Sequence, residues 1–154
     1  MRRLDSTDRI LLELLQEDAH LSLAQLSKRV GAPASTVNDR IKRLERQGLI
    51  AGFHARLAPE ALGLNLLAFM LVCWTHPKVE PVFLKKIKAS PMVLECHHIT
   101  GPWNYLLKLR LGTTRDLEKF LAETVKAVPG VERTETLIVL SSAKETWQMH
   151  IPED

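Results

Sequence analysis

Little in this sequence points to a secreted protein or a membrane protein. It has only two cysteines, Cys73 and Cys96, and no CxxC pair, which argues against a disulfide scaffold and fits a reduced compartment. Its longest apolar run, Leu66–Trp74, covers nine residues, whereas a membrane-spanning helix needs roughly 20. No apolar segment near the N-terminus precedes a small-residue cleavage site, so no secretory signal is expected. We therefore expect a cytoplasmic protein that does not contact a membrane.

Sequence signatures of catalysis are also missing. The chain has no GxSxG motif, no P-loop and no HExxH motif, so no catalytic residues are predicted. Cys96, His97 and His98, with Cys73 on another segment, raise the alternative of a metal site. Side chains alternate along a strand, so this segment offers at most two ligands on one face. We interpret these residues as buried cysteine and ordinary histidine, with no metal and no cofactor. An enzyme remains a remote alternative, which activity surviving deletion of residues 1–50 would reveal.

What the chain does have is a globular composition and an unevenly distributed charge. Of its 154 residues, 45% are hydrophobic and 25% are charged, which excludes a disordered chain. The net charge of +3 resides in residues 1–56, because residues 57–154 are neutral in sum. Residues 28–56 alone carry +5. Such a local positive excess is typical of a segment that faces phosphate groups.

The N-terminal region reads as short amphipathic helices with clear end signals. A first helix is predicted to run to about Gln16, with Asp5 as its N-cap, acidic Asp8 in its first turn and apolar residues on one face. Ser22 and Gln25 form a capping-box pattern that opens a helix over Leu23–Val30, and Gly31 supplies a left-handed stop.

A third helix is predicted from about Ala34 to Gln47. Val37, Ile41 and Leu44 define its core face, and the opposite face is basic. A short helix, a glycine turn and a second amphipathic helix make a helix-turn-helix, whose second helix enters the major groove of DNA. The structural alternative is a charged face that is merely solvated. It is disfavoured because the charge excess coincides with the second helix of the pair.

The outer face of this third helix supplies the candidate DNA contacts. Polar side chains in its early turns are candidates for base edges. Basic side chains nearby are candidates for phosphate contacts, which position a protein without reading sequence. Arg40, about 60° from the core axis, either packs at the domain edge or reaches a phosphate. The base-edge candidates are Ser35, Asn38, Asp39 and Lys42, the phosphate candidates are Lys28, Arg43 and Arg46, and Thr36 completes the predicted set.

The remaining two thirds of the chain alternate between strand and helix patterns. An extended hinge over residues 49–57 and a helical turn near Pro59–Gly63 come first. The order that follows is βαββαβ, the ferredoxin-like arrangement, so the predicted fold class is α+β. A final segment, residues 144–151, is predicted as an edge strand or an arm. The predicted strands are Leu66–Thr75, Met92–His98, Trp103–Leu111 and Val131–Ser141. One predicted helix is Val79–Ala89, and a second is capped by Thr114 and runs to about Ala127. The residues of this second helix that face inward are Leu117, Phe120, Leu121, Thr124 and Val128.

A four-stranded sheet with helices on one side needs cover on its other face. We expect Trp74, Trp103, Leu107 and Ile138 to contribute an apolar open face. A second copy of the chain is the natural cover, so a homodimer through this domain is predicted.

Short motifs recur in a fixed order along the whole chain. In this order and spacing they resemble the Lrp/AsnC (feast/famine) regulators of bacteria and archaea. The motifs are Leu4-Asp5 with Asp8 and Ile10-Leu11, Ser35-Thr36-Val37 with Arg40-Ile41 and Leu44-Glu45, Gly48-Leu49-Ile50, Gly101 with Asn104-Tyr105, and Pro129-Gly130-Val131 with Thr134-Glu135-Thr136.

The resemblance implies a transcription regulator that binds double-stranded DNA in the nucleoid. It implies a winged helix-turn-helix over residues 1–50, a hinge strand and short helix over 51–64, and a ligand-responsive dimerisation domain over 65–154. Dimers of such regulators often assemble into octamers of four dimers. An amino-acid effector typically binds between dimers, and the matching positions here are Thr100, Gly101, Asn104 and Tyr105, with Thr134 and Thr136 opposite.

The chain departs from the family pattern at two positions. Pro33 stands where a serine cap is common, which costs about 1 kcal/mol of helix stability. Asn104 stands where an aspartate is usual, and an amide cannot supply a negative charge to an ammonium group. An architectural DNA-binding protein without a small-molecule effector therefore stays open as the alternative function.

Overall fold

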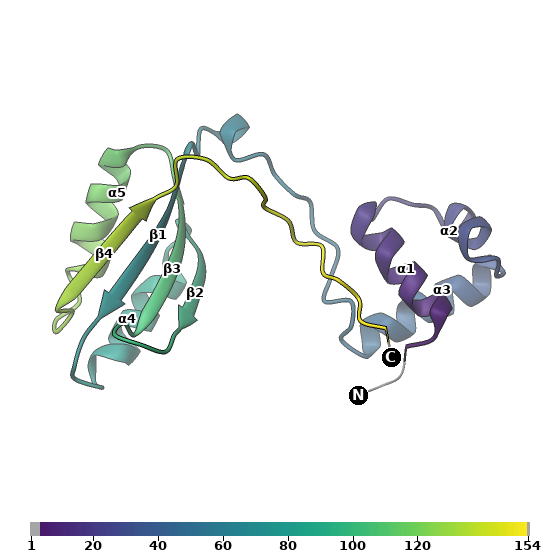
Figure 1. Cartoon of the computed structure of the whole chain (residues 1–154), viewed down its shortest axis with the longest axis horizontal. Helices are drawn as coiled ribbons and strands as arrows, with labels where there is room; N and C mark the ends of the chain where they lie inside the picture. The colour runs from purple at the N-terminus through teal and green to yellow at the C-terminus, as the bar shows by residue number, and fades with distance from the viewer. Residues whose placement is uncertain (1–3, 154) are drawn as a thin grey trace. The chain divides into compact units, whose positions relative to one another are not determined.

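Two units make up residues 4–153, the part of the chain that the computed structural model describes (Figure 1). The first unit extends to Arg56 and includes the chain again from Lys144 onward. The second unit is Leu57–Ala143. Each unit has its own hydrophobic core, so the two are described separately below.

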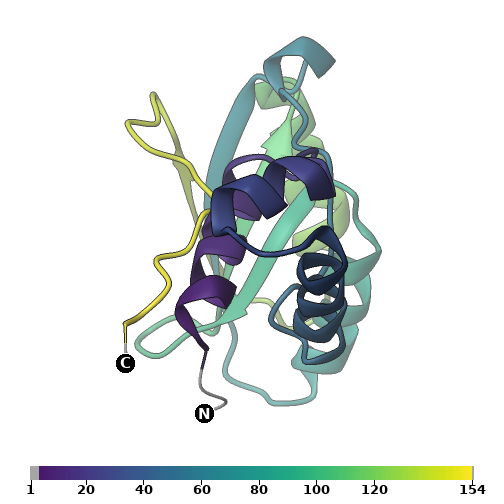
Figure 2. The ribbon, with the colours of Figure 1, turned by 90° about the vertical axis from the view of Figure 1, so that its right-hand side faces the viewer.

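The first unit contains three helices, α1 (Ser6–Glu17), α2 (Leu23–Val30) and α3 (Ala34–Arg46), visible together in Figure 2. All three lie within a residue or so of their predicted bounds. Their common core is formed by Leu11, Leu26 and Val37, which are at most 1% exposed. Burying such a side chain stabilises a fold by roughly 1.5–3 kcal/mol, so these residues hold the helices together.

The ends of these helices follow the local signals in the sequence. The Asp5 carboxylate accepts a hydrogen bond from the backbone N–H of Asp8 at 2.8 Å, which caps α1. Ser22 and Gln25 form both bonds of a capping box at the start of α2. Gly31 ends α2 with a φ of 67°, a left-handed conformation that glycine adopts without strain. The predicted caps of α1 and α2 are therefore confirmed, and Pro33 indeed gives α3 no side-chain cap.

The C-terminal segment from Lys144 is an arm rather than a strand of the sheet. The Gln16 side chain of α1 makes two hydrogen bonds to Met149 of this arm. Gln16 Nε2 donates to the Met149 carbonyl at 3.1 Å, and Gln16 Oε1 accepts from the Met149 N–H at 2.6 Å. Gln148 returns a bond to the Gln16 carbonyl, and Arg56 donates to the Glu145 carbonyl at 3.1 Å. The hinge before the second unit contains no regular strand over residues 51–58.

The second unit has the predicted βαββαβ order. Its four strands form one sheet in the order β2-β3-β1-β4, with every neighbouring pair antiparallel. A short 3-10 turn, η1 (Glu60–Leu62), precedes the sheet, as the sequence predicts. The elements are β1 (Leu66–Cys73), α4 (Val79–Ala89), β2 (Val93–His98), β3 (Tyr105–Leu111), α5 (Thr114–Phe120), a π-helical turn η2 (Leu121–Val125) and β4 (Arg133–Ile138).

Two details of the last helix differ from the prediction. The N-cap is Thr113 rather than Thr114, because the Thr113 hydroxyl and the Asp116 carboxylate complete a capping box. The π-helical turn η2 then adds a residue to the helix turn, which rotates Val125 rather than Thr124 into the core.

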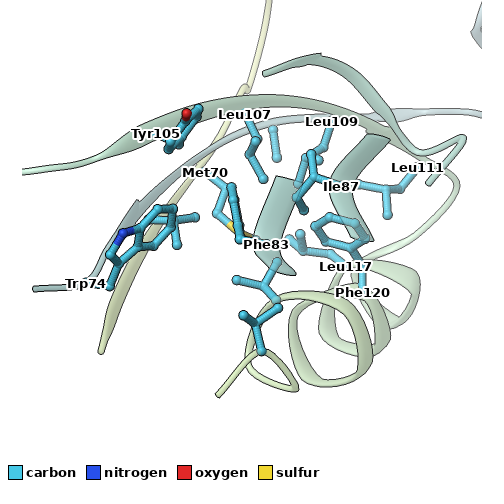
Figure 3. Packing of buried hydrophobic residues seen from close by; sticks show 14 of the residues in the cluster. Met70, Trp74, Phe83, Ile87, Tyr105, Leu107, Leu109, Leu111, Leu117 and Phe120 are labelled. Carbon is cyan, nitrogen blue, oxygen red and sulfur yellow. The ribbon is translucent and has the colours of Figure 1, made fainter. Parts of the chain in front are cut away.

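Helices α4 and α5 cover one face of the sheet (Figure 3). Met70 of β1 and Leu107 of β3 are fully buried there, against Phe83 of α4. Trp74 and Tyr105 extend this core at one end of the sheet, where their rings stack with centroids 5.6 Å apart.

The predicted composition of the open face is wrong for three of its four residues. Trp74 and Leu107 lie in the helix-covered core, and Ile138 pairs with Ala68 on that same side. Trp103 lies in the β2–β3 loop against Arg133. Since paired residues share a face, the opposite face presents the alternate residues of each strand. Its apolar members include Phe69 and Leu71 of β1, Leu106 of β3 and Leu137 of β4.

Candidate nucleic-acid interface and effector site

The turn between α2 and α3 is short and hydrogen-bonded. The Ser27 hydroxyl donates to the Ala32 carbonyl at 2.6 Å, across the left-handed Gly31. Pro33 is the N-cap of α3, with the extended backbone (φ −55°, ψ 144°) that an N-cap residue adopts. The two helices are thereby held as a helix-turn-helix pair, and the outer surface of α3 is left uncovered.

Most of the predicted DNA contacts are exposed side chains on this outer surface. Asn38 is half-buried, at the edge of the face. Val37 and Leu44 on the other side of the helix are fully buried, so the amphipathic reading of α3 is correct. The exposed candidates are Lys28 in the last turn of α2 and Ser35, Thr36, Asp39, Lys42 and Arg46 of α3.

Arg40 and Arg43 differ from the other candidates because both bind helix α1. The Arg43 Nη2 lies 2.6 Å from both carboxylate oxygens of Asp8. The Arg40 Nη1 lies 2.8 Å from Asp8 Oδ1 and 2.5 Å from Asp5 Oδ2. Their predicted contacts with DNA stay predictions, and the structure assigns both guanidinium groups a second role in joining α3 to α1.

Asp8 is the centre of this cluster and is almost completely buried, with a side chain 4% exposed. A buried carboxylate is tolerated only when it is paired and hydrogen-bonded, and Asp8 meets both conditions through Arg40 and Arg43. Hydrogen bonding to Arg40 is the main cause that lowers the pKa of Asp5, and the same bond raises the pKa of Arg40.

The sequence predicts Asp8 only as a favourable acidic residue of the first turn of α1. A signal for its true position exists in the sequence, because Asp8 precedes Leu11 by three residues and therefore lies on the apolar face of α1. A charged residue on a core-facing stripe calls for a partner of opposite charge.

The predicted effector residues of the β2–β3 turn are organised by backbone bonds. Gly101 has a φ of 109°, a conformation that favours glycine. The Asn104 carbonyl accepts from the Ile99 N–H at 3.0 Å, which closes the turn. The Asn104 side-chain oxygen accepts from the Trp74 N–H at 2.7 Å. Asn104 thus joins the turn to the end of β1, and Thr100 lies exposed beside it.

Tyr105 is buried rather than open to a ligand within this chain. Its hydroxyl donates to Glu80 Oε1 at 2.5 Å, and its ring stacks on His98 with centroids 5.0 Å apart. Burial, helped by the hydrogen bond and negative charge of Glu80, raises the pKa of Tyr105 to about 12. Neither Glu80 nor this bond was foreseen, since the two residues lie 25 positions apart.

Thr134 and Thr136 of β4 lie on the far side of β1 from the turn residues. Thr134 pairs with Val72, and Val72 pairs in turn with Tyr105. The register therefore places Tyr105 and Thr134 in one row, two strands apart, or about 10 Å. Both threonines are half-buried. The sheet thus brings the predicted effector residues to one end, without joining them in direct contact.

Trp103 bridges the turn to β4 by a contact the sequence did not predict. The Arg133 guanidinium carbon lies 4.2 Å from the centroid of the Trp103 ring, which is a cation–π arrangement. Two contacts therefore hold the turn that carries Gly101 and Asn104. Asn104 is hydrogen-bonded to the end of β1, and Trp103 packs against Arg133 of β4.

Residues 4–153 contain no group of three or more His, Cys, Asp or Glu side chains that could hold a metal ion. Cys73 and Cys96 are half-buried free thiols. Burial raises the pKa of the Cys96 thiol, which disfavours the thiolate that metals bind. In the same described range, no helix is long and apolar enough to cross a membrane.

Both units match known protein families. A model of the winged helix-turn-helix DNA-binding domain matches residues 4–51, and a model of the Lrp/AsnC ligand binding domain matches residues 68–149.

Proteins similar over almost the whole chain include regulators from archaea and bacteria. The HTH-type transcriptional regulator FL11 of Pyrococcus furiosus is 38% identical over 148 residues, which cover 96% of this chain and 97% of that protein. The leucine-responsive regulatory protein of Escherichia coli (strain K12) is 37% identical over 145 residues, 93% of this chain and 88% of that protein. Among solved structures, the transcriptional regulator NMB0573 of Neisseria meningitidis, in complex with L-Met, has a TM-score of 0.92 at 31% identity and covers 96% of this chain and 97% of that one.

Proposed function

The chain belongs to the Lrp/AsnC family of transcription regulators, and on that premise we propose that α3 reads DNA sequence in the major groove. The observation that carries the proposal is the outer face of α3, where polar and basic side chains are exposed behind a hydrogen-bonded turn. Such a helix fits the major groove and presents its early residues to base edges. The proposed base readers are Ser35, Thr36, Asn38, Asp39 and Lys42, and the proposed phosphate contacts are Lys28 and Arg46. The two other predicted contacts, Arg40 and Arg43, are bonded to the carboxylates of Asp5 and Asp8.

Binding of the full chain to a selected duplex and to a random duplex tests this assignment. Arg46→Ala should weaken both equally and flatten the salt dependence of log K by about 0.9, the loss of one phosphate contact. Lys42→Ala should instead lower the preference for the selected duplex by about 1–3 kcal/mol. Lys85→Ala, an exposed lysine of α4, is the matched control and should change neither quantity. Equal losses for Lys42→Ala on both duplexes would contradict its role in reading bases.

We further propose that the second unit responds to an amino acid at the β2–β3 turn. Support comes from the braced turn around Gly101 and Asn104, and from the relatives, one of which is named leucine-responsive and another of which was solved with L-Met. Backbone groups at a glycine turn approach a ligand closely, and threonine hydroxyls such as Thr134 both donate and accept. The matching residues are Thr100, Gly101, Asn104, Tyr105, Thr134 and Thr136.

A thermal-shift screen of the full chain against the amino acids separates this from the architectural alternative. Selective stabilisation by one amino acid, lost in Gly101→Val, supports the sensor. No stabilisation by any amino acid would favour a DNA-binding protein without an effector.

Self-association through the open face of the sheet completes the proposal. Its apolar residues Phe69, Leu71, Leu106 and Leu137 form a surface that a second copy would cover. An octamer of four such dimers, bound to the nucleoid, is the larger assembly we propose. Leu71→Glu should lower the sedimenting mass, whereas Val82→Glu on the outer side of α4 should not. An unchanged mass for Leu71→Glu would contradict this interface.

A further inference from the structure

The basic side chains of helix α3 do not all have the same surroundings. Lys42 and Arg46 are exposed on the outer face, whereas Arg40 and Arg43 reach back to α1. Arg43 places one nitrogen against both oxygens of Asp8, and its Nε is buried and makes no hydrogen bond within residues 4–153. The bonds to Asp8 therefore set the orientation of the Arg43 guanidinium, although this orientation leaves its Nε without a hydrogen-bond partner in the described residues.

The charge of the cluster balances locally. Two guanidinium groups, of Arg40 and Arg43, meet two carboxylates, of Asp5 and Asp8, at distances of 2.5–2.8 Å. Asp8 is buried, so salt screens its pairs weakly. The net charge of +5 over residues 28–56 includes Arg40 and Arg43, whose charges Asp5 and Asp8 neutralise. The positive charge that DNA meets is therefore smaller by two units.

The burial of Asp8 disfavours the movement of Arg43 from this carboxylate to a DNA phosphate. If Arg43 moved to a DNA phosphate, Asp8 would keep a buried negative charge with one partner fewer, and breaking a buried pair is far more costly than breaking an exposed one. Lys28 and Arg46 are exposed and leave no buried charge behind when they bind phosphate.

We propose that Asp8, assisted by Asp5, is a positioning residue that withholds Arg40 and Arg43 from DNA phosphates and so limits binding to non-specific DNA. The inference rests on the proposed function of α3, and it sharpens that function. Phosphate contacts carry no sequence information and strengthen binding to every duplex. A regulator that lacks two of them therefore has a higher ratio of affinity for its own site to affinity for random DNA.

The test is the salt dependence of binding of full-length Asp8→Asn to a random duplex and to the selected duplex. Release of one or two arginines should steepen the slope of log K against log salt by about one to two, at about 0.9 per new contact. Affinity for the random duplex should rise at low salt, and the ratio of selected to random affinity should fall. A merely structural role for Asp8 would weaken binding to both duplexes and would not steepen the slope.

Glu13→Gln is the control, because Glu13 is an exposed acid of the same helix and no ion pair involves it in the described part of the chain. It removes an equal charge without releasing an arginine and should leave the slope unchanged. An unchanged or flatter slope for folded Asp8→Asn, or an equal steepening by Glu13→Gln, would overturn the inference.

Asp5→Asn keeps the test decisive if Asp8→Asn does not fold. Asparagine caps a helix as well as aspartate does, and Asp5 is half-exposed, so this variant should remain folded. It loosens Arg40 alone and should steepen the slope by at most about one, whereas no steepening would overturn the inference. Failure of the wild-type chain to bind any duplex would instead refute the proposed function.

Discussion

Gly130 gives the sharpest stability prediction, because two separable effects act at one position. It lies just before β4 with a φ of 92°, and a Cβ built there would come within 2.6 Å of Val79 Cγ2. Gly130→Ala should therefore suffer backbone strain of about 1–2 kcal/mol. Relief of the overlap with Val79 adds about 1–3 kcal/mol, so the total loss of unfolding free energy is about 2–5 kcal/mol.

Gly101→Ala separates the two contributions. Gly101 has a similar φ of 109°, but a Cβ there meets no heavy atom within 4 Å, so only the strain of about 1–2 kcal/mol applies. In a Val79→Ala background the overlapping Cγ2 is gone, and Gly130→Ala should then cost about 1–3 kcal/mol less than in the wild type. The double-mutant cycle should therefore show favourable coupling.

Urea denaturation of the full chain, followed by tryptophan fluorescence, to which the buried Trp74 contributes, measures these free energies. Equal costs for Gly130→Ala and Gly101→Ala, or strictly additive costs in the cycle, would refute the steric part of the reasoning. A loss below about 0.5 kcal/mol at both glycines would refute the strain part as well.

Tyr105 is the only tyrosine, so its phenolate absorbance should titrate near pH 12, and Glu80→Gln should move the midpoint toward the ordinary value near 10. Since folding raises this pKa, the stabilisation is present below about pH 10 and is lost as the pH rises toward 12; a native midpoint near 10 would contradict the buried hydrogen bond. Ser22→Ala should lower the unfolding free energy by about 1 kcal/mol through loss of the α2 cap, while Ser6→Ala in the exposed first turn of α1 should stay within about 0.5 kcal/mol. Equal effects of the two serine changes would argue against the capping box.

Local signals in the sequence were sufficient for most of the architecture. The capping box at Ser22 and the left-handed stop at Gly31 depend only on neighbours within four residues, which is why α2 was predicted to its exact bounds. The βαββαβ order followed from alternating apolar patterns in the same way. The π-helical turn after α5 was missed because no nearby residue announces it, and it exchanged Thr124 for Val125 in the core.

Features that depend on pairing between distant segments could not be predicted. The open face was assigned to Trp74 and Leu107, yet a shift of one residue in a strand moves every side chain to the other face. The ion pairs of Asp8 with Arg43 span 35 positions, and the bond from Tyr105 to Glu80 spans 25. Charge counted along the sequence accordingly overstated how many arginines α3 leaves free.

Selection of binding sites from a random duplex pool by the full chain, followed by footprinting of the recovered sites, is the decisive test of whether α3 reads DNA sequence. We expect one enriched motif that occurs as two inverted half-sites, with centres about 10 base pairs or a multiple of that apart, because a symmetric dimer presents two copies of α3. Recovery of sequences with no common motif, or protection that ignores sequence, would contradict a sequence-reading role for α3.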